Sequence, residues 1–404
     1  MAASTCNVQR WLDATASTEH DLDFLGHQYH GYKHALMTCL SGTSMNDMTI
    51  YESLHSRLDN SNFMKLVDAC SPVKELLQNP EFCSTVWVPR NDPTEPFWGD
   101  IPKKDLQEFL HRHISPGFSP IYFLLTAPTD DTLLWSPELN GVQRVTLRPS
   151  LEGMRINNYS KIVESDYHVK NGLIHFIDQP IPPAPSIKEL IMALPSQEFG
   201  FFQKAFQLSD LYLGKIGYPE IRGGFTVFIP TNAAFDKLSE AERTLIFSDE
   251  GDPYLKRLIE YHVGNWQTLY SNRCYDADTP PEQFAHEPSP TPDHTVPTPE
   301  TQDDPIWRVL KGKRRFVLST SIEDHDLSVD ITRVGGLISM SVNGIANVTV
   351  QNGLASDGVC HIIDSVLCPS IQKPEQTRER DTSLDMRDVL RMLMPATDSI
   401  ELTL

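Results

Sequence analysis

The sequence predicts an α+β fold built from two tandem copies of one domain. In each half of the 404-residue chain, helical periodicity comes first and alternating strand-like runs follow, the order typical of α+β domains. Three sequence blocks recur in the same order in both halves. Turn dipeptides such as Asn343-Gly344 separate strand-like runs and favour hairpins. We therefore expect each copy to pack its helices on a mostly antiparallel β-sheet or wedge.

The first copy begins with helical patterns. Apolar residues recur every three to four positions over residues 48–77 and again over 105–113, which predicts amphipathic helices. Between them, the run 84–89 has β character and stops at a proline. Three later runs are interpreted as strands, at residues 121–125, 143–147 and 173–177.

The second copy repeats this order after an extended proline-rich linker at residues 180–185. Helices are expected over residues 187–194 and 201–213, then a proline-stopped strand at 225–230 and a helix at 254–262. The remaining strands are expected at residues 315–318, 327–331, 337–342 and 348–350.

These patterns divide the chain into four parts. We expect an N-terminal extension (1–47), a divergent first repeat (48–183), a second repeat (184–370) and a C-terminal tail with a short amphipathic helix (371–404). Residues 276–305, inside the second repeat, are rich in proline and acid and nearly free of large apolar residues. Such a segment cannot bury enough surface to order itself, so we expect a disordered insertion.

Charge and composition limit the possible partners. The hydrophobic fraction of 40% is ordinary for a globular protein, whereas 34 basic and 54 acidic residues give a net charge of −20. An acidic surface repels phosphate backbones, so nucleic acid is not an expected partner. The one dense basic run, Lys311-Gly-Lys-Arg-Arg315, precedes an alternating apolar run and is interpreted as a solvated strand entry.

The cysteines and the chain ends bear on location. The seven cysteines show no Cys-x-x-Cys spacing, and we expect reduced, buried thiols. The N-terminus lacks the apolar run of a secretory signal, and no stretch approaches the roughly 20 apolar residues of a membrane span. As the sequence stands, we expect no transmembrane segment and a cytoplasmic location; secretion or a vacuolar location would require a signal that has been removed.

The recurring blocks carry a family resemblance. Residues 85–91 match 226–232, residues 106–114 match 255–263, and residues 171–178 match 356–364 with one extra residue. These blocks resemble the fasciclin (FAS1) family, and the chain is similar to a fungal-type member of it. The second repeat is the closer match, whereas the first carries Arg112 where the family has tyrosine and Arg90 where it has threonine. The resemblance covers about residues 48–370 and implies two tandem FAS1 domains.

The polar residues of these blocks are interpreted as structural. An asparagine after a proline-ended strand can bond nearby backbone and form a turn, and a histidine that ends a helix suits the C-terminal dipole. Histidines in alternating apolar strands are expected in the core, and the aspartates that follow should tie the closing strand to its neighbours. The structural residues are Asn91, His175, Asp178, Asn232, Tyr261, His262, His361 and Asp364.

Candidate binding residues lie nearer the N-terminus. His27, His30 and His34 have the spacing of one helical face, and Asp23 could join them as a weak divalent-metal site. The alternative is a solvated or domain-packing segment. Together with Arg112 and His113, these three histidines are our candidate ligand-binding residues. No phosphate loop or nucleophile elbow occurs, so we name no catalytic residue and expect neither a cofactor nor a firm metal site.

The family resemblance implies two functions. We favour a protein that binds a hydrophobic small molecule and acts as an accessory, cyclase or coupling-directing protein in secondary-metabolite biosynthesis. Any enzymatic step would then be a cofactor-independent cyclisation or coupling. The alternative is a non-enzymatic protein–protein interaction or cell-adhesion module. An apolar cavity would favour the first function, and a flat exposed apolar patch the second.

Overall fold

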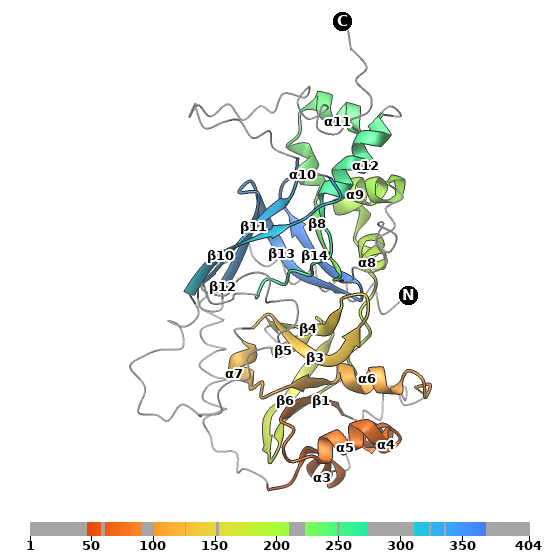
Figure 1. The fold of residues 1–404 in the computed structure, drawn as a ribbon, viewed down its shortest axis with the longest axis vertical. Helices are drawn as coiled ribbons and strands as arrows, with labels where there is room; N and C mark the ends of the chain where they lie inside the picture. Colours follow the sequence, from red (N-terminus) through yellow and green to blue (C-terminus); the bar gives the residue numbers. More distant parts are fainter. Residues whose placement is uncertain are drawn as a thin grey trace, which may run out of the picture.

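The computed structural model of the protein describes residues 47–57, 61–90, 101–125, 127–150, 153–209, 223–248, 251–272, 311–322, 325–334 and 337–368. They form two seven-stranded sheets. Figure 1 shows the second sheet above the first, with helices α3–α5 at one far end of the molecule and α9–α12 at the other. The two sheets therefore approach each other in the middle.

The first repeat has the strand order β2-β1-β7-β6-β5-β4-β3. Strands β1 and β7 are parallel, and every other neighbouring pair in this sheet is antiparallel. The strands are β1 Ser84–Pro89, β2 Ile114–Pro116, β3 Thr129–Ser136, β4 Gly141–Ser150, β5 Gly153–Ile156, β6 Ser160–Val169 and β7 Gly172–Ile177.

Five described helices accompany this sheet: α3 Ile50–His55, α4 Ser61–Asp68, α5 Ser71–Gln78, α6 Leu106–Arg112 and α7 Ile121–Leu124. Thr49 and Glu52 start α3 with a reciprocal capping box. The apolar faces of α3–α6 pack on β1 and β7 around fully buried side chains such as Phe63, Leu77 and Phe176. The apolar residues that recur every three to four positions in the sequence are therefore the ones that the helices bury in this core.

The second repeat has the same topology. Its order is β10-β11-β12-β13-β14-β8-β9, with β8 and β14 as the parallel pair. The strands are β8 Phe225–Pro230, β9 Val263–Gly264, β10 Lys311–Leu318, β11 Leu327–Val334, β12 Leu337–Val342, β13 Ala346–Ala355 and β14 Gly358–Ile363. The helices are α8 Ile187–Ala193, α9 Ser196–Leu208, α10 Asn232–Asp236, α11 Glu240–Ile246 and α12 Asp252–Tyr261.

The structure corrects one predicted element. Residues 121–125 were expected to form a strand, but Ile121–Leu124 form helix α7. Ile121 and Leu124 are buried while Phe123 is 45% exposed, which is a helical burial pattern. The helix is anchored because Asp166, in β6, accepts a hydrogen bond from the Ile121 amide at 2.9 Å. A short apolar run cannot distinguish strand from helix by its periodicity, and this distant partner decides the outcome.

Several predicted features lie outside the described residues. They are the N-terminal extension with Asp23, His27, His30 and His34, the turn residue Asn91, the insertion 276–305 and the tail 371–404. The predicted domain boundaries and the disorder of the insertion stay predictions. Within the described ranges, no helix is both long and apolar enough to cross a membrane. Four cysteines are described, and they are thiols, of which Cys70, Cys360 and Cys368 are buried.

Candidate functional site

Two histidines close equivalent helices in the two repeats. His113 follows α6 and His262 follows α12, and both are fully buried. Each Nδ1 lies 2.7 Å from the carbonyl oxygen four residues earlier. Each Nε2 accepts a backbone N–H, from Ile181 at 2.9 Å and from Leu367 at 3.0 Å. Both ring nitrogens are thus occupied, and the neutral imidazole joins its helix to the segment after the closing strand.

The second histidine pair lies in the closing strands. His175 in β7 and His361 in β14 are fully buried, and each stacks on an aromatic ring of the parallel neighbour strand. Their Nε2 atoms lie 3.0 and 2.9 Å from the carbonyl oxygens of Ser119 and Leu269. Their Nδ1 atoms accept the backbone N–H of Asp166 and Asn352. These rings tie the sheet to the loop that crosses it.

Burial keeps all four rings neutral. Desolvation lowers the pKa of His113 to about 3 and the pKa values of His262 and His361 to about 4, and it also lowers the pKa of His175. Arg112 precedes His113 and is half-buried, and its pKa is lowered by burial, an effect that Glu108 partly opposes. Arg112 and His113 are neighbours, but His113 could bind a ligand only by giving up one of its hydrogen bonds.

The remaining structural residues bond neighbouring elements. Asp178 and Asp364 accept backbone N–H groups at the start of β6 and β13, from Lys161 at 2.7 Å and Asn347 at 2.9 Å. Tyr261 is buried, and its hydroxyl accepts from the Asn343 amide at 2.9 Å.

Asn232 has a longer reach than a local turn. Its side chain bonds the backbone of α9 at Gln197 and Phe201. Thr231 caps α10 instead. Among the described residues, no group of three or more His, Cys, Asp or Glu side chains could hold a metal ion.

The two repeats meet through a polar interface. Arg144 pairs with Asp131 at 2.6 Å and lies over the ring of Tyr270 from the second repeat, 4.8 Å from its centroid. The Thr129 hydroxyl donates to the Asn272 side chain at 2.7 Å, and the Asn272 amide returns a bond to the Thr129 carbonyl at 3.0 Å.

Three further bonds cross nearby. Gln143 and Ser136 both donate to the Ser356 carbonyl, and Arg148 donates to the Gln351 carbonyl at 2.8 Å. This arrangement holds one face of β4 against β13.

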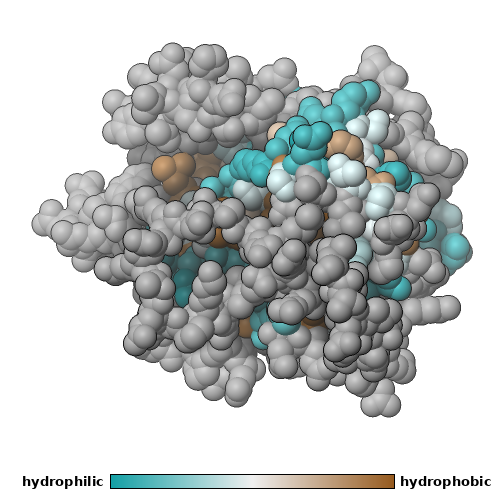
Figure 2. All heavy atoms as spheres, turned by 90° about the horizontal axis from the view of Figure 1, so that it is seen from above, coloured by the Kyte–Doolittle hydropathy of each residue, from teal (hydrophilic) through white to brown (hydrophobic). Residues whose placement is uncertain are grey.

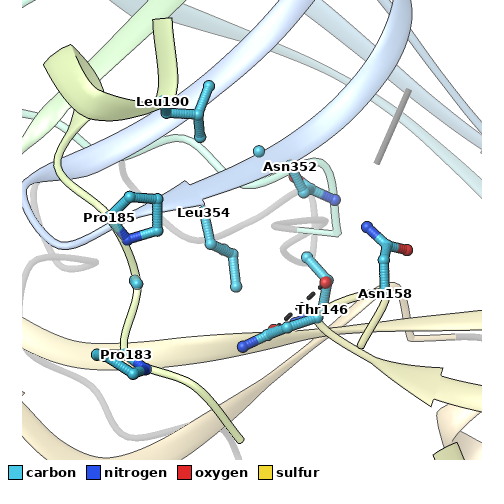
Figure 3. A pocket seen from close by; sticks show the side chains of 10 residues that line it. Thr146, Asn158, Pro183, Pro185, Leu190, Asn352 and Leu354 are labelled. Atoms are coloured by element: carbon cyan, nitrogen blue, oxygen red, sulfur yellow. Dashed lines mark hydrogen bonds between the residues drawn. The ribbon is translucent and has the colours of Figure 1, made fainter. Parts of the chain in front are cut away.

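A cleft opens beside this interface. It encloses about 430 Å³ of atom-free space, which includes the solvent at its open mouth. Ten described residues from four separate segments line it: Thr146, Asn157, Asn158, Pro183, Ala184, Pro185, Leu190, Asn352, Gly353 and Leu354. Figure 3 shows the linker prolines and Leu354 on one side and the asparagines on the other. We call this the inter-repeat cleft.

Asn158 is the distinctive polar group of the inter-repeat cleft. It lies in the hairpin between β5 and β6 with φ +55°, a conformation that asparagine tolerates better than most residues. Its exposure is only 7%, yet its side chain makes no hydrogen bond to any described residue. Figure 3 shows this side chain rising from the first repeat toward Asn352 of the second.

The neighbouring asparagines already make hydrogen bonds to described residues. Asn157 accepts the Thr146 backbone N–H at 2.8 Å, and Asn352 bonds both the amide and the hydroxyl of Ser271. The opposite wall carries the rings of Pro183 and Pro185 and the side chains of Leu190 and Leu354, which are apolar surfaces suited to a flat hydrophobic molecule. Among the asparagine side chains of the described lining, Asn158 is the one that makes no hydrogen bond to a described residue, so both its oxygen and its NH₂ group are available to a ligand.

The described exposed surface offers less for recognition. The large exposed apolar side chains are scattered over different elements: Met48, Phe123, Trp135, Val163, Phe201, Leu208, Val317, Leu337 and Ile345. Seen from above, the described residues are mostly hydrophilic with small separate hydrophobic spots (Figure 2). Single exposed apolar side chains of this kind are ordinary on the surfaces of globular proteins.

The comparison with known proteins decides the family. The sequence matches the Fasciclin domain over residues 59–183 and 199–369, which is more than half of the chain. The chain belongs to the fasciclin family. A solved FAS1 domain pair from the insect cell adhesion molecule fasciclin I is 13% identical and covers 76% of this chain and 97% of its own, with a TM-score of 0.31.

Two curated fasciclin relatives differ in how far they match. The aurofusarin biosynthesis cluster protein S of Gibberella zeae is 24% identical over 359 residues, which is 83% of this chain and 80% of that protein. Human periostin is 26% identical over 219 residues, which is 54% of this chain but 20% of periostin. The chain therefore matches protein S along most of both lengths.

Sequence reasoning did not identify the inter-repeat cleft of this fasciclin pair. Its described lining comes from β4, the β5–β6 hairpin, the proline linker with α8, and β13, and β13 lies far from the others in sequence. The only local signals were the adjacent pair Asn157-Asn158 and the linker Pro180-Ile-Pro-Pro-Ala-Pro185. Neither signal shows that the two segments face each other.

Proposed function

We propose that this fasciclin protein binds a hydrophobic small molecule in the inter-repeat cleft and acts as an accessory, cyclase or coupling-directing protein in secondary-metabolite biosynthesis. The observation that carries the proposal is Asn158, a residue only 7% exposed whose side-chain amide has no partner among the described residues and is left facing the solvent of a cleft lined by prolines and leucines.

The energetics of Asn158 support a bound ligand. The Asn158 amide is not shut away from water, so a ligand oxygen that accepts from its NH₂ group would exchange a bond to water for a bond to the ligand, a net gain of about 0.5–1.5 kcal/mol. The apolar wall would gain roughly 25 cal/mol for each Å² of ligand surface that it removes from water. These two terms favour a flat apolar molecule with a carbonyl or hydroxyl oxygen.

The fasciclin relatives support a role in secondary-metabolite biosynthesis. Protein S, which matches over most of both chains, is named for the aurofusarin biosynthesis cluster. Periostin and the fasciclin-like arabinogalactan protein of Arthroderma benhamiae match this chain over 20% and 27% of their own lengths. The match to protein S along most of both chains supports the biosynthetic proposal over the adhesion alternative.

The proposed role needs positioning of the substrate and no covalent step. Thr146 and the asparagines of the cleft are weak nucleophiles, and none of the described lining residues has a titratable side chain. Holding a flexible intermediate in one conformation can by itself direct which atoms react, because the entropy of orientation is removed before reaction. A product-directing role follows more directly from this lining than acid–base catalysis does.

The test measures binding of a fused-ring aromatic probe, methyl 1-hydroxy-2-naphthoate, to the full chain by calorimetry. Asn158→Gly removes the amide and tolerates the positive φ, so affinity should fall about three- to tenfold, the value of one hydrogen bond. Asn140→Gly is the matched control, since Asn140 also has positive φ but lies in an exposed turn. Absence of binding, or equal losses in both variants, would contradict the proposal and favour the protein-interaction alternative.

A further inference from the structure

We propose that the ligand of the inter-repeat cleft carries an anionic oxygen, as in an aromatic carboxylic acid, and that Arg148 recognises it. This inference rests on the proposed function and adds the charge class of the ligand.

Arg148 is not one of the lining residues, but it is a close neighbour of two of them, Thr146 and Asn352. It is two residues beyond Thr146 on β4, so both side chains lie on the same face of the strand, opposite the buried Leu147. Its Nη2 donates to the carbonyl oxygen of Gln351, the residue before the cleft residue Asn352. The guanidinium therefore lies between the two repeats, next to the cleft lining.

The guanidinium has no acidic partner among the described residues. Among the described residues it donates one hydrogen bond, to Gln351, and four of its five N–H donors have no protein acceptor there. Other arginines contrast with it: Arg144 pairs with Asp131 and Arg315 with Asp330.

Arg155 of β5 is directly across from Arg148 in the register, and its Nη1 donates to the Tyr159 carbonyl oxygen at 3.1 Å. The chain as a whole has a net charge of −20, so the positive charge of Arg148 is a local exception to an acidic protein.

The surroundings strengthen the case for an anion. Arg148 is half-buried, and desolvation lowers its pKa to about 10, so it stays charged at neutral pH without full hydration. A charge-assisted hydrogen bond is roughly twice as strong as a neutral one, and the guanidinium fork matches the two oxygens of a carboxylate. With the proline rings for the flat face and Asn158 for a second oxygen, the donor set fits an aromatic hydroxy acid.

A matched pair of probes tests this inference on the full chain. 1-Hydroxy-2-naphthoate and its methyl ester have the same ring system and differ in charge. We expect the acid to bind at least tenfold tighter than the ester. Arg148→Gln should lower affinity for the acid by tenfold or more, the range for a charged hydrogen bond, and change affinity for the ester by less than twofold. Arg314→Gln, at another half-buried strand arginine, should change neither.

One further variant, a folding check and a competition experiment distinguish the possible results. Arg148→Lys keeps the charge and should keep most of the preference for the acid, and urea denaturation of each variant checks that it folds. If Arg148→Gln does not fold, the wild-type ratio of acid to ester decides. Inorganic phosphate at millimolar concentration should not displace the acid; displacement would mean a general anion site and overturn the aromatic assignment.

The two proposals fail differently. Equal affinity for acid and ester in the wild type, or equal losses for both in Arg148→Gln, would overturn the role of Arg148 and leave the proposed function standing. Failure of both probes to bind the wild type would overturn the proposed function and this inference with it.

Discussion

At the scale of single residues, the four buried histidines of the fasciclin repeats act as neutral connectors. His175 and His361, like His113 and His262, use both ring nitrogens on backbone groups, with equivalent bonds in the two repeats. Protonation would force an acceptor nitrogen to become a donor facing an N–H group. The stability of the fold should therefore depend on pH through these four rings.

We predict that stability falls as pH drops from 6.5 to 4. An unfolded histidine titrates near 6.5, whereas the folded pKa values are about 3 for His113 and about 4 for His262 and His361. Over this interval the unfolded chain binds more protons, so the free energy of unfolding rises with pH and is lost on acidification.

Two aspartates oppose this trend. Burial raises the pKa of Asp130 to about 6 and also raises the pKa of Asp357, so these carboxyls favour the folded state on acidification. Four histidines outweigh them, and we expect a net loss of at least about 2 kcal/mol between pH 7 and pH 5. Urea denaturation at pH 7, 6 and 5 measures it, and constant or increasing stability on acidification would refute the connector role.

At the scale of elements, the parallel strand pair constrains each repeat most tightly. Gly358 begins β14 directly opposite Phe225 of β8, and a Cβ built there would overlap the Phe225 carbonyl oxygen. Gly172 has the same relation to Ser84 in the first repeat. Glycine at these positions permits the close approach of two backbones.

We predict that Gly358→Ala lowers the free energy of unfolding by about 1–3 kcal/mol, because the parallel pair must move apart to admit the methyl group. The matched control is Gly200→Ala in α9, where the nearest atom would be 3.9 Å away. This change should be neutral or stabilise by up to about 1 kcal/mol through helix propensity. Chemical denaturation of both variants checks the prediction, and a neutral Gly358→Ala would show that the pair is loosely packed.

The elements also show what sequence can predict. The proline-stopped strands at 84–89 and 225–230 have the predicted bounds, because alternation and proline are local signals. Residues 121–125 were misread because their structure depends on Asp166, 45 positions away. The cleft was missed for the same reason: Asn158 and Leu354 become neighbours only when the two repeats pack together.

At the scale of the whole molecule, the interface between the repeats determines whether the cleft exists. Arg144 is its most connected residue, since it contacts Asp131 and Thr129 of the first repeat and Tyr270 and Asn272 of the second. The Arg144 and Asp131 side chains are 17% and 10% exposed, so solvent screens their pair weakly.

We predict that Arg144→Ala lowers the free energy of unfolding by about 3 kcal/mol, because it leaves the largely buried Asp131 carboxylate without its counter-charge. We also expect the two repeats of this variant to unfold in separate transitions. Arg315→Ala removes a pair whose arginine is 65% exposed, so solvent screens it and the loss of stability should be much smaller than for Arg144→Ala. Urea transitions followed by fluorescence and circular dichroism test both effects. If Arg144→Ala behaves like Arg315→Ala, the interface does not hold the repeats together.

The central claim is that the inter-repeat cleft binds a flat hydrophobic molecule, and a crystal structure of the full chain with methyl 1-hydroxy-2-naphthoate tests it most directly. The account predicts electron density for the ring between Pro185 and Leu354, with a ligand oxygen accepting a hydrogen bond from the Asn158 amide. An empty cleft at a probe concentration that saturates binding in solution, or the probe bound elsewhere on the protein, would contradict the account.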